Sequence, residues 1–238
     1  AAFHRGVPVI HLEAGLRTFD KDNPYPEEFN RCAISALADI HLCPTISSMQ
    51  NLKMSLGKNI NAHVVGNTVL DNLSRYPSLA EDFVLVTMHR RENHENIKEW
   101  FTAINNIAKN SDLDFILPLH PNPNVVKFSH ILTDVEVVSP LPYDTCIDMV
   151  SRCKFLITDS GGLQEESSFF GKRCIVCRKV SERTEGIGDF AFMCPEPKDL
   201  ESIYDCVSNA RPTLVPLDCP YGDGKSAEKI AEILRSVI

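Results

Sequence analysis

The 238-residue chain is acidic, with 32 Asp and Glu against 24 Lys and Arg and a formal net charge of −8 at pH 7. This balance argues against a polybasic nucleic-acid-binding protein. Hydrophobic residues make up 43% and charged residues 24%, the composition of a globular protein with one large or two small domains. The sequence has no apolar run of membrane-spanning length and does not open in signal-peptide order, so we expect a cytoplasmic protein.

The nine cysteines are scattered and odd in number, which predicts free thiols rather than a disulfide framework. Cys174 and Cys177 lie close together, but residues three apart on a strand point to opposite faces and cannot share a tetrahedral metal. We therefore expect no metal site.

Short apolar runs alternate with amphipathic stretches in the first part of the chain. Proline with acidic residues at a first turn, and a Thr45 start with a Gly57 stop, indicate two helices. The expected strands are 7–14, 40–43 and 63–67, and the expected helices are 26–39 and 45–57. Residue 14 would end a buried strand.

After a polar linker at 71–82 the same alternation restarts, which indicates a second unit. The expected strands are 83–89, 114–120, 135–139, 154–160 and 173–178, and the expected helices are 95–110, 143–153, 161–171, 197–210 and 224–238. Continuous Val, Ile and Leu runs such as KFLIT are typical of parallel strands that are covered on both faces. The fold class predicted is α/β, with two doubly wound parallel-sheet units.

Polar clusters follow several predicted strands, where doubly wound folds bind ligands. In ITDSGGLQEE, a strand ends in Ser160, Gly161 and Gly162 and a helix begins at once, which favours phosphate binding by free backbone N–H groups. Glu165 and Glu166, one turn later, would accept hydrogen bonds from sugar hydroxyls. The alternative is a tight turn whose acids merely suit the helix dipole.

Two acids and two arginines, in HLEAGLRT and PEEFNR, follow the first strand. Glu13 and Glu27 are candidates for acid–base work, and Arg17 and Arg31 for holding a phosphate. Surface salt bridges are the alternative. Glu13 stands out because a charge at the end of a buried strand needs a reason.

Two weaker signals are also basic. In HRREN, His89 would face the cleft and Arg90 a phosphate or an acid, although a structural histidine is the commoner outcome. In SERTEG, Arg183 lies between Glu182 and Glu185, a pattern typical of a solvated charge run in a loop.

Eight segments in order, HLEAGLRT, PEEFNR, GNTVLD, HRREN, HPNPNV, LITDSGGLQEE, SERTEG and PYGDG, resemble the bacterial non-hydrolysing UDP-N-acetylglucosamine 2-epimerases. The resemblance runs along the whole chain. It implies the glycosyltransferase-B architecture of two Rossmann-like domains, here 1–72 and 73–222, with a final helix at 223–238 that crosses back to the first domain. The family chain is longer at its N-terminus by roughly a hundred residues. The first domain is therefore expected to be incomplete and to lack an active-site aspartate.

The resemblance implies epimerisation at C2 of UDP-N-acetylglucosamine by elimination and readdition of UDP, without a cofactor, for surface polysaccharide synthesis. The implied catalytic residues are Glu13, Glu27 and His89. The implied UDP-binding residues are Ser160, Gly161, Gly162, Glu166, Arg183 and, near the uracil, Cys146. Arg17, Arg31 and Arg90 are predicted to contact phosphate or a second, allosteric nucleotide sugar. A homodimer follows from the resemblance, and neither nucleic acid nor a membrane is expected as a partner.

The chain departs from the family pattern at three positions, where Thr184, Leu141 and Cys219 stand in place of proline, glutamine and asparagine. The expected function is that of a fragment which binds UDP and turns over the nucleotide sugar poorly or not at all. A hydrolysing epimerase, a glycosyltransferase of the same architecture and a non-catalytic UDP-sugar sensor are the alternatives.

Overall fold

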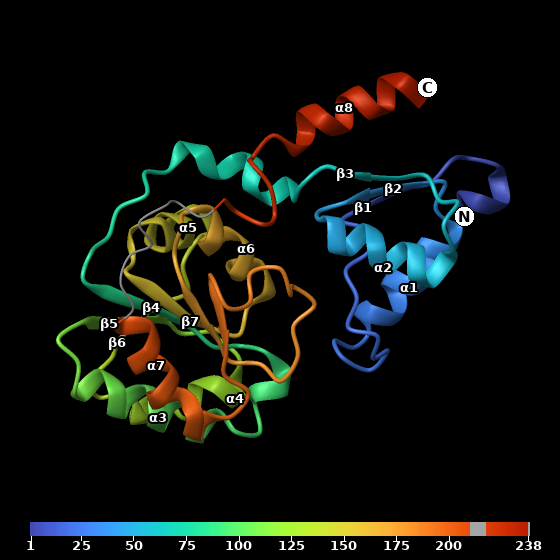
Figure 1. Ribbon diagram of the computed structural model, residues 1–238. Helices are drawn as coiled ribbons and strands as arrows, with labels where there is room; N and C mark the ends of the chain where they lie inside the picture. The colour runs from blue at the N-terminus through green and yellow to red at the C-terminus, as the bar shows by residue number, and fades with distance from the viewer. Residues whose placement is uncertain (210–217, 238) are drawn as a thin grey trace. The chain divides into compact units, whose positions relative to one another are not determined.

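A computed structural model describes residues 1–209 and 218–237 of the chain. The molecule divides into two compact units, one made of residues 1–74, 182–185 and 218–238 and the other of 75–181 and 186–217 (Figure 1). Residues 210–217 of the predicted second domain lie outside the described residues. So do residues 210 and 238, which end two predicted helices. The domain boundaries expected after residues 72 and 222 remain a prediction.

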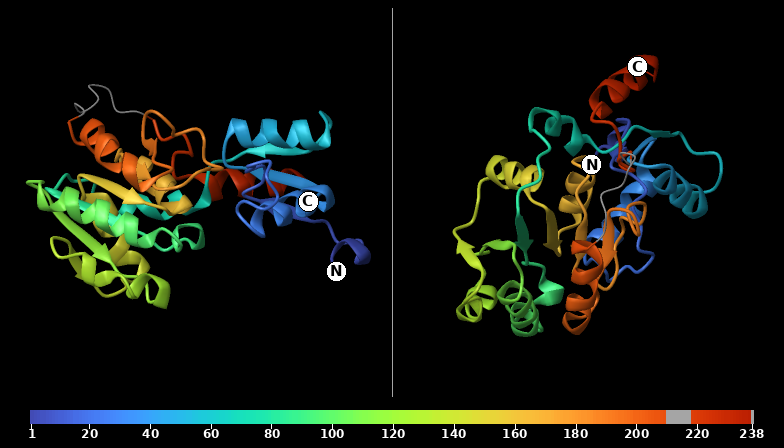
Figure 2. Two further views of the ribbon diagram at one scale, coloured as in Figure 1. Left: turned by 90° about the horizontal axis from the view of Figure 1, so that it is seen from below. Right: turned by 60° about the vertical axis from the view of Figure 1, so that its left-hand side comes forward.

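The first unit is built on a three-stranded parallel sheet in the order β1-β2-β3. Its strands are β1 (Ile10–Leu12), β2 (Ile40–Cys43) and β3 (Ala62–Val64), and its helices are α1 (Glu27–Leu37), α2 (Ile46–Leu56) and α8 (Ser226–Val237), with short 3-10 turns at Phe3–Arg5 and Thr68–Arg75. Leu52 of α2 packs with Cys43, whereas Ile230 and Ile233 of α8 pack against Leu42. Neighbouring strand residues face opposite sides, so α2 and α8 cover opposite faces of this sheet (Figure 2).

Helix α2 begins and ends where the sequence predicts. The Thr45 hydroxyl accepts a hydrogen bond from the Ser48 backbone N–H at 3.0 Å, and the Gly57 N–H closes the helix on the Lys53 carbonyl. Gly15, with φ +90°, lies so close to α2 that an added Cβ would be 2.0 Å from the Ser48 carbonyl oxygen. The turn after β1 therefore requires glycine.

Two expectations for the first unit are wrong. The strand predicted at 7–14 spans only Ile10–Leu12, and Ile10 and Leu12 are 40% and 48% exposed rather than buried, because β1 is the edge strand of the sheet. The predicted linker at 71–82 begins inside the 3-10 helix Thr68–Arg75, whose Leu70 and Leu73 are buried.

The second unit contains a six-stranded parallel sheet in the order β6-β5-β4-β7-β8-β9. Its strands are β4 (Phe83–Thr87), β5 (Asp114–Pro118), β6 (Glu136–Val138), β7 (Phe155–Thr158), β8 (Cys174–Val176) and β9 (Ala191–Met193). The first five were predicted, and β9 was not. In this doubly wound order the direction of strand addition reverses between β4 and β7, the point at which such folds bind nucleotides.

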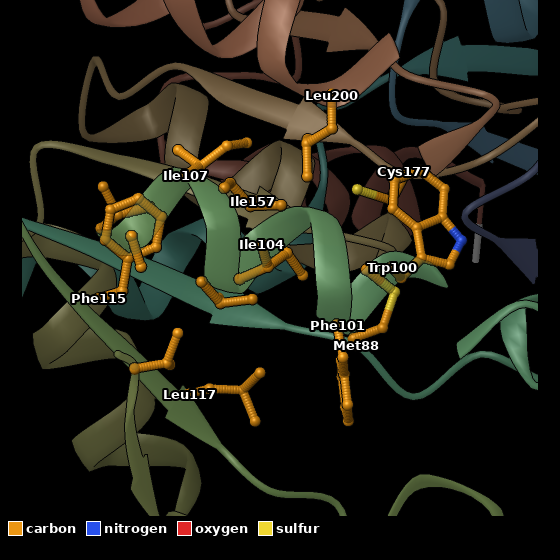
Figure 3. Close-up of a cluster of buried hydrophobic side chains, with 14 of the residues drawn as sticks. Met88, Trp100, Phe101, Ile104, Ile107, Phe115, Leu117, Ile157, Cys177 and Leu200 are labelled. Carbon is orange, nitrogen blue, oxygen red and sulfur yellow. The ribbon is translucent and has the colours of Figure 1, made fainter. Parts of the chain in front are cut away.

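Helices cover both faces of the second sheet, so the predicted α/β class with parallel sheets is correct. They are α3 (Ile97–Lys109), α4 (Pro123–Val126), α5 (Tyr143–Arg152), α6 (Gly161–Phe169) and α7 (Leu200–Ser208), with 3-10 turns at Arg91–Asn93, Ser129–Ile131 and Pro197–Asp199. Helices α3 and α7 lie on one face and α5 and α6 on the other (Figures 1 and 2). Trp100, Phe101 and Ile104 of α3 pack in the main core with Ile157 of β7 and Leu200 of α7 (Figure 3). Among the described residues, no helix is long and apolar enough to span a membrane.

Candidate functional site

A pocket of about 340 Å³ lies in the second unit at the reversal point of its sheet. Its lining comes from the residues that follow β4, β5 and β6 and from helices α5 and α6. Four of the predicted site residues, His89, Cys146, Ser160 and Glu166, line it together. A concave site of this size suits a small ligand.

The turn between β7 and α6 offers backbone donors. Thr158 ends β7, and its hydroxyl accepts the Ser160 N–H at 3.0 Å, which fixes the turn. Helix α6 starts at Gly161, and its first N–H groups have no acceptor within the helix. The space beside Gly162 is open, because an added Cβ would meet nothing within 4 Å. An anion can therefore approach these groups closely.

Glu166 is the acid of α6 that lines the pocket. It is buried, and one of its carboxylate oxygens accepts a hydrogen bond from the Tyr143 hydroxyl at 2.9 Å. Burial, together with the Glu166 charge, raises the pKa of Tyr143, so the tyrosine remains a donor. Glu165, the other sugar-binding candidate, is buried but is not part of the pocket lining.

Cys146 lines the pocket from helix α5. Burial raises the pKa of this thiol to about 11, which keeps it protonated at neutral pH. It offers apolar and van der Waals contact to a ligand rather than nucleophilic chemistry.

His89 follows β4 and stacks on His120, with ring centroids 5.5 Å apart. Burial lowers the pKa of His89, the charges of His120, Arg90 and His94 lower it further, and the Asp159 carboxylate opposes this shift. The imidazole is therefore neutral at neutral pH and can act as a hydrogen-bond donor or acceptor. Arg90, next in the chain, is half-buried and does not line the pocket.

Glu13 and Arg183 form an ion pair in the first unit, with a carboxylate oxygen 3.6 Å from the guanidinium. The Asn67 amide also donates to Glu13, at 3.3 Å. Glu13 has φ +59°, a left-handed conformation that is uncommon outside glycine, and its side chain is about half exposed. Held in this way, the carboxylate remains accessible to a ligand.

Two of the three charged residues of SERTEG are buried and Glu185 is half-buried, contrary to the solvated loop expected from its composition. Glu182 is 4% exposed and Arg183 is 7% exposed, and the two side chains approach to 2.5 Å. Glu182 also pairs with Arg31 at 3.4 Å, and Arg31 pairs with Glu28 at 3.7 Å. The predicted residues Arg31 and Arg183 are thus joined through an acid that composition alone assigned to solvent.

Glu27 and Arg17, the other predicted residues of the first unit, do not take part in these ion pairs. Glu27 is the exposed first residue of α1. Arg17 is buried and donates to the Leu16 carbonyl and to Ser35, both neutral acceptors, rather than to an acid. The Ser35 hydroxyl also lies 3.3 Å from His11 Nδ1. Ser35 thus links the Arg17 guanidinium to a buried histidine.

The sequence assigned no role to three residues that shape the site. Tyr143 and Asn67 hold Glu166 and Glu13, and although Asn67 lies in the segment GNTVLD, neither residue was predicted to contact an acid. Asp159 is fully buried beneath the His89 turn. Its signal was available, because an acid that ends a buried apolar strand needs partners.

Comparison with known proteins gives one consistent result. Residues 1–235 match the family model described as UDP-N-acetylglucosamine 2-epimerase. A UDP-N-acetylglucosamine 2-epimerase from Campylobacter jejuni is 35% identical over 270 residues, which cover 98% of this chain and 70% of the relative.

Solved structures agree. The MnaA–UDP structure from Staphylococcus aureus superposes with a TM-score of 0.88 at 30% identity, covering 99% of this chain and 69% of the other. A Neisseria meningitidis UDP-GlcNAc 2-epimerase bound to UDP-GlcNAc gives a TM-score of 0.87 at 31% identity, covering 99% and 71%. With the doubly wound sheet and its pocket, these matches show that the chain belongs to the UDP-N-acetylglucosamine 2-epimerase family.

Proposed function

We propose that this protein interconverts UDP-N-acetylglucosamine and UDP-N-acetylmannosamine by elimination and readdition of UDP. The observation that carries the proposal is the pocket at the reversal of the second sheet, where Ser160 of the turn before α6, the buried acid Glu166 and the neutral His89 meet. Related proteins with these activities in their names, and structures that hold UDP or UDP-GlcNAc, support it.

The second unit would bind the nucleotide half of the substrate. The N–H groups at Gly161 and Gly162 suit the diphosphate, and Glu166 suits the ribose hydroxyls. His89, once it has taken up a second proton, would donate a hydrogen bond from Nε2 to the leaving diphosphate, whose negative charge grows as the bond to the sugar breaks.

The first unit would supply the proton transfers at the sugar. A carboxylate, for which we propose Glu13, takes the proton from C2, and the electron pair forms a C1–C2 double bond. The C1–O bond breaks with its electron pair remaining on UDP. Readdition of UDP to C1 and of a proton to the opposite face of C2 completes epimerisation, with Glu27 proposed as the second acid. Arg183, whose guanidinium lies 3.6 Å from the Glu13 carboxylate, would orient this carboxylate and contact the substrate.

Some features of the proposal follow from the resemblance alone. They are the homodimer, the role in surface polysaccharide synthesis and the contacts of Arg17, Arg31 and Arg90 with phosphate or with an allosteric nucleotide sugar. The reduced turnover predicted for the 238-residue chain belongs with them.

Incubation with UDP-N-acetylglucosamine in heavy water tests the reaction. We expect deuterium at C2 of the recovered nucleotide sugar, even if slowly, and UDP binding by calorimetry. Release of free N-acetylmannosamine and UDP would instead indicate a hydrolysing enzyme. Binding without deuterium in any sugar would contradict the epimerase proposal and favour a transferase or a sensor. Rapid epimerisation would contradict only the predicted reduced turnover.

The role of Glu13 is tested by Glu13→Gln. This variant should lose deuterium incorporation by about 100-fold or more while it still binds UDP, because the amide cannot accept the C2 proton. Glu201→Gln, an exposed acid on α7, is the matched control and should leave both properties unchanged.

A further inference from the structure

We propose that Asp159 is a positioning residue that fixes the orientation and the tautomer of the His89 imidazole in the pocket. The inference deepens the proposed function, on which it rests, because it assigns the group through which His89 is prepared to meet the diphosphate. Asp159 itself is fully buried and does not line the pocket.

One carboxylate oxygen of Asp159 anchors the turn that carries His89. Asp159 Oδ2 accepts hydrogen bonds from the backbone N–H groups of His89 at 2.9 Å and Arg90 at 2.8 Å, and from the Asn93 amide at 3.1 Å. Three donors on one oxygen compensate a buried carboxylate for its lost hydration. The anchor therefore sets where the Cα of His89 lies.

The other oxygen faces the imidazole. Asp159 Oδ1 is buried and, among the described residues, has no hydrogen-bond partner, yet it lies 3.4 Å from His89 Nδ1. A buried carboxylate oxygen without a donor is unfavourable, so a proton on Nδ1, the ring nitrogen that faces it, is favoured. A carboxylate beside one ring nitrogen selects the tautomer protonated there, which leaves Nε2 as the acceptor in the neutral ring.

The turn that carries His89 is also held by residues that follow β8. The distinct effect of Asp159 is therefore on the His89 ring rather than on the backbone. The Asn93 amide donates to the Cys177 carbonyl at 3.0 Å, and Arg178 pairs with Glu92 at 2.9 Å. His94 Nε2 lies 3.1 Å from the His89 carbonyl oxygen. These contacts hold the backbone even when the Asp159 charge is removed.

The charged and titratable groups that face His89 are Asp159, His120, Arg90 and His94. Asp159 is the acid among them, and it favours the protonated imidazolium, whereas the other three disfavour it. A proton passed to His89 during readdition or release of UDP would therefore be stabilised by this carboxylate.

Asp159→Asn separates the two effects of Asp159, because it keeps the acceptor for the backbone turn but removes the acceptor for His89 Nδ1. The amide oxygen can still accept from His89 N–H, Arg90 N–H and Asn93, but its NH₂ group then points at Nδ1 and can only donate. The neutral ring must therefore carry its proton on Nε2, the effect known from the Asp→Asn change in the serine-protease triad.

Long-range ¹H–¹⁵N spectra of the 238-residue chain report the tautomer, with His89 assigned by the spectrum of His89→Gln. We expect Nδ1 protonated in the wild type, Nε2 protonated in Asp159→Asn, and a lower His89 pKa in that variant. Deuterium incorporation should fall by about 100-fold, while UDP binding is retained. Asp134→Asn, an exposed acid of the same unit that is also held by side-chain donors, should change none of these.

The proposal is overturned if wild-type His89 carries its neutral proton on Nε2, a measurement that needs no variant to fold. An unchanged tautomer in a folded Asp159→Asn would overturn it as well. If the tautomer reverses as expected but the wild type incorporates no deuterium, then the epimerase proposal fails while the role of Asp159 in positioning His89 stands.

Discussion

Lowering the pH should destabilise the first unit through protonation of His11. This side chain is 9% exposed, and burial, followed by the charges of His41, Arg17 and Arg31, lowers its pKa from 6.5 to about 4. The folded protein thus keeps His11 neutral over a range in which the unfolded chain binds a proton. Its contribution to stability is fully present above pH 6.5 and is lost as the pH falls from 6.5 to 4.

The size of the effect follows from the shift. A change of 2.5 pKa units corresponds to about 3 kcal/mol below pH 4, and the linkage relation gives about 2 kcal/mol at pH 5. His11→Asn removes the titration and keeps an N–H donor for the Ser35 hydroxyl. The variant will be less stable at pH 7.5 but should escape this part of the acid loss.

Hydrogen exchange of peptides that cover β2, at pH 7.5 and pH 5 and corrected for intrinsic rates, measures the free energy of opening the first unit. Relative to His11→Asn, the wild type should lose protection by a further factor of about 30 between the two pH values. His4→Asn, at an exposed histidine, should behave like the wild type. Equal losses in the wild type and His11→Asn would refute the reasoning, because the other titratable groups are common to both proteins.

Three further outcomes are expected. Gly15→Ala should prevent stable folding of the first unit, because the new Cβ would lie 2.0 Å from the Ser48 carbonyl oxygen. Gly6→Ala, at φ +65° but in open space, should lower the free energy of unfolding by only about 1 kcal/mol. Thermal unfolding of the two variants measures the difference. Tyr143→Phe should weaken UDP binding by about 2- to 10-fold in calorimetry, because Glu166 loses the donor that orients it. Thr45→Ala should cost about 1 kcal/mol of helix-cap stability, measured by exchange of the α2 amides.

Local signals were sufficient for most of the elements. The Thr45 cap and Gly57 stop bound α2, and the apolar runs at 40–43 and 155–158 form strands, because caps and continuous burial are written in neighbouring residues. Strand β9 was missed, since AFM is short and only its pairing with β8 makes it a strand. Burial of β1 was overestimated because an edge position is a property of the sheet and not of the segment.

The sequence predicted which residues come together in the pocket, but it did not predict which charged residues are buried and paired. His89, Ser160 and Glu166 come together because parallel strands end at one edge of the sheet, which the strand pattern already implies. Glu182 and Arg183 were assigned to solvent because composition carries no information about a partner 151 residues away, as Arg31 is. For Asp159 the sequence indicates that partners are needed but not which ones, because its three donors come from the segment after another strand.

The first unit is assembled from pieces that leave the ribosome far apart in time. Residues 1–74 emerge first, but Ile230 and Ile233, which cover one face of their sheet, emerge more than 150 residues later. At synthesis rates of about 5–20 residues per second this delay is on the order of ten seconds, during which Ile40, Leu42 and Val65 lack that cover. One face of the sheet of the first unit is therefore completed only when the last helix of the chain has been made.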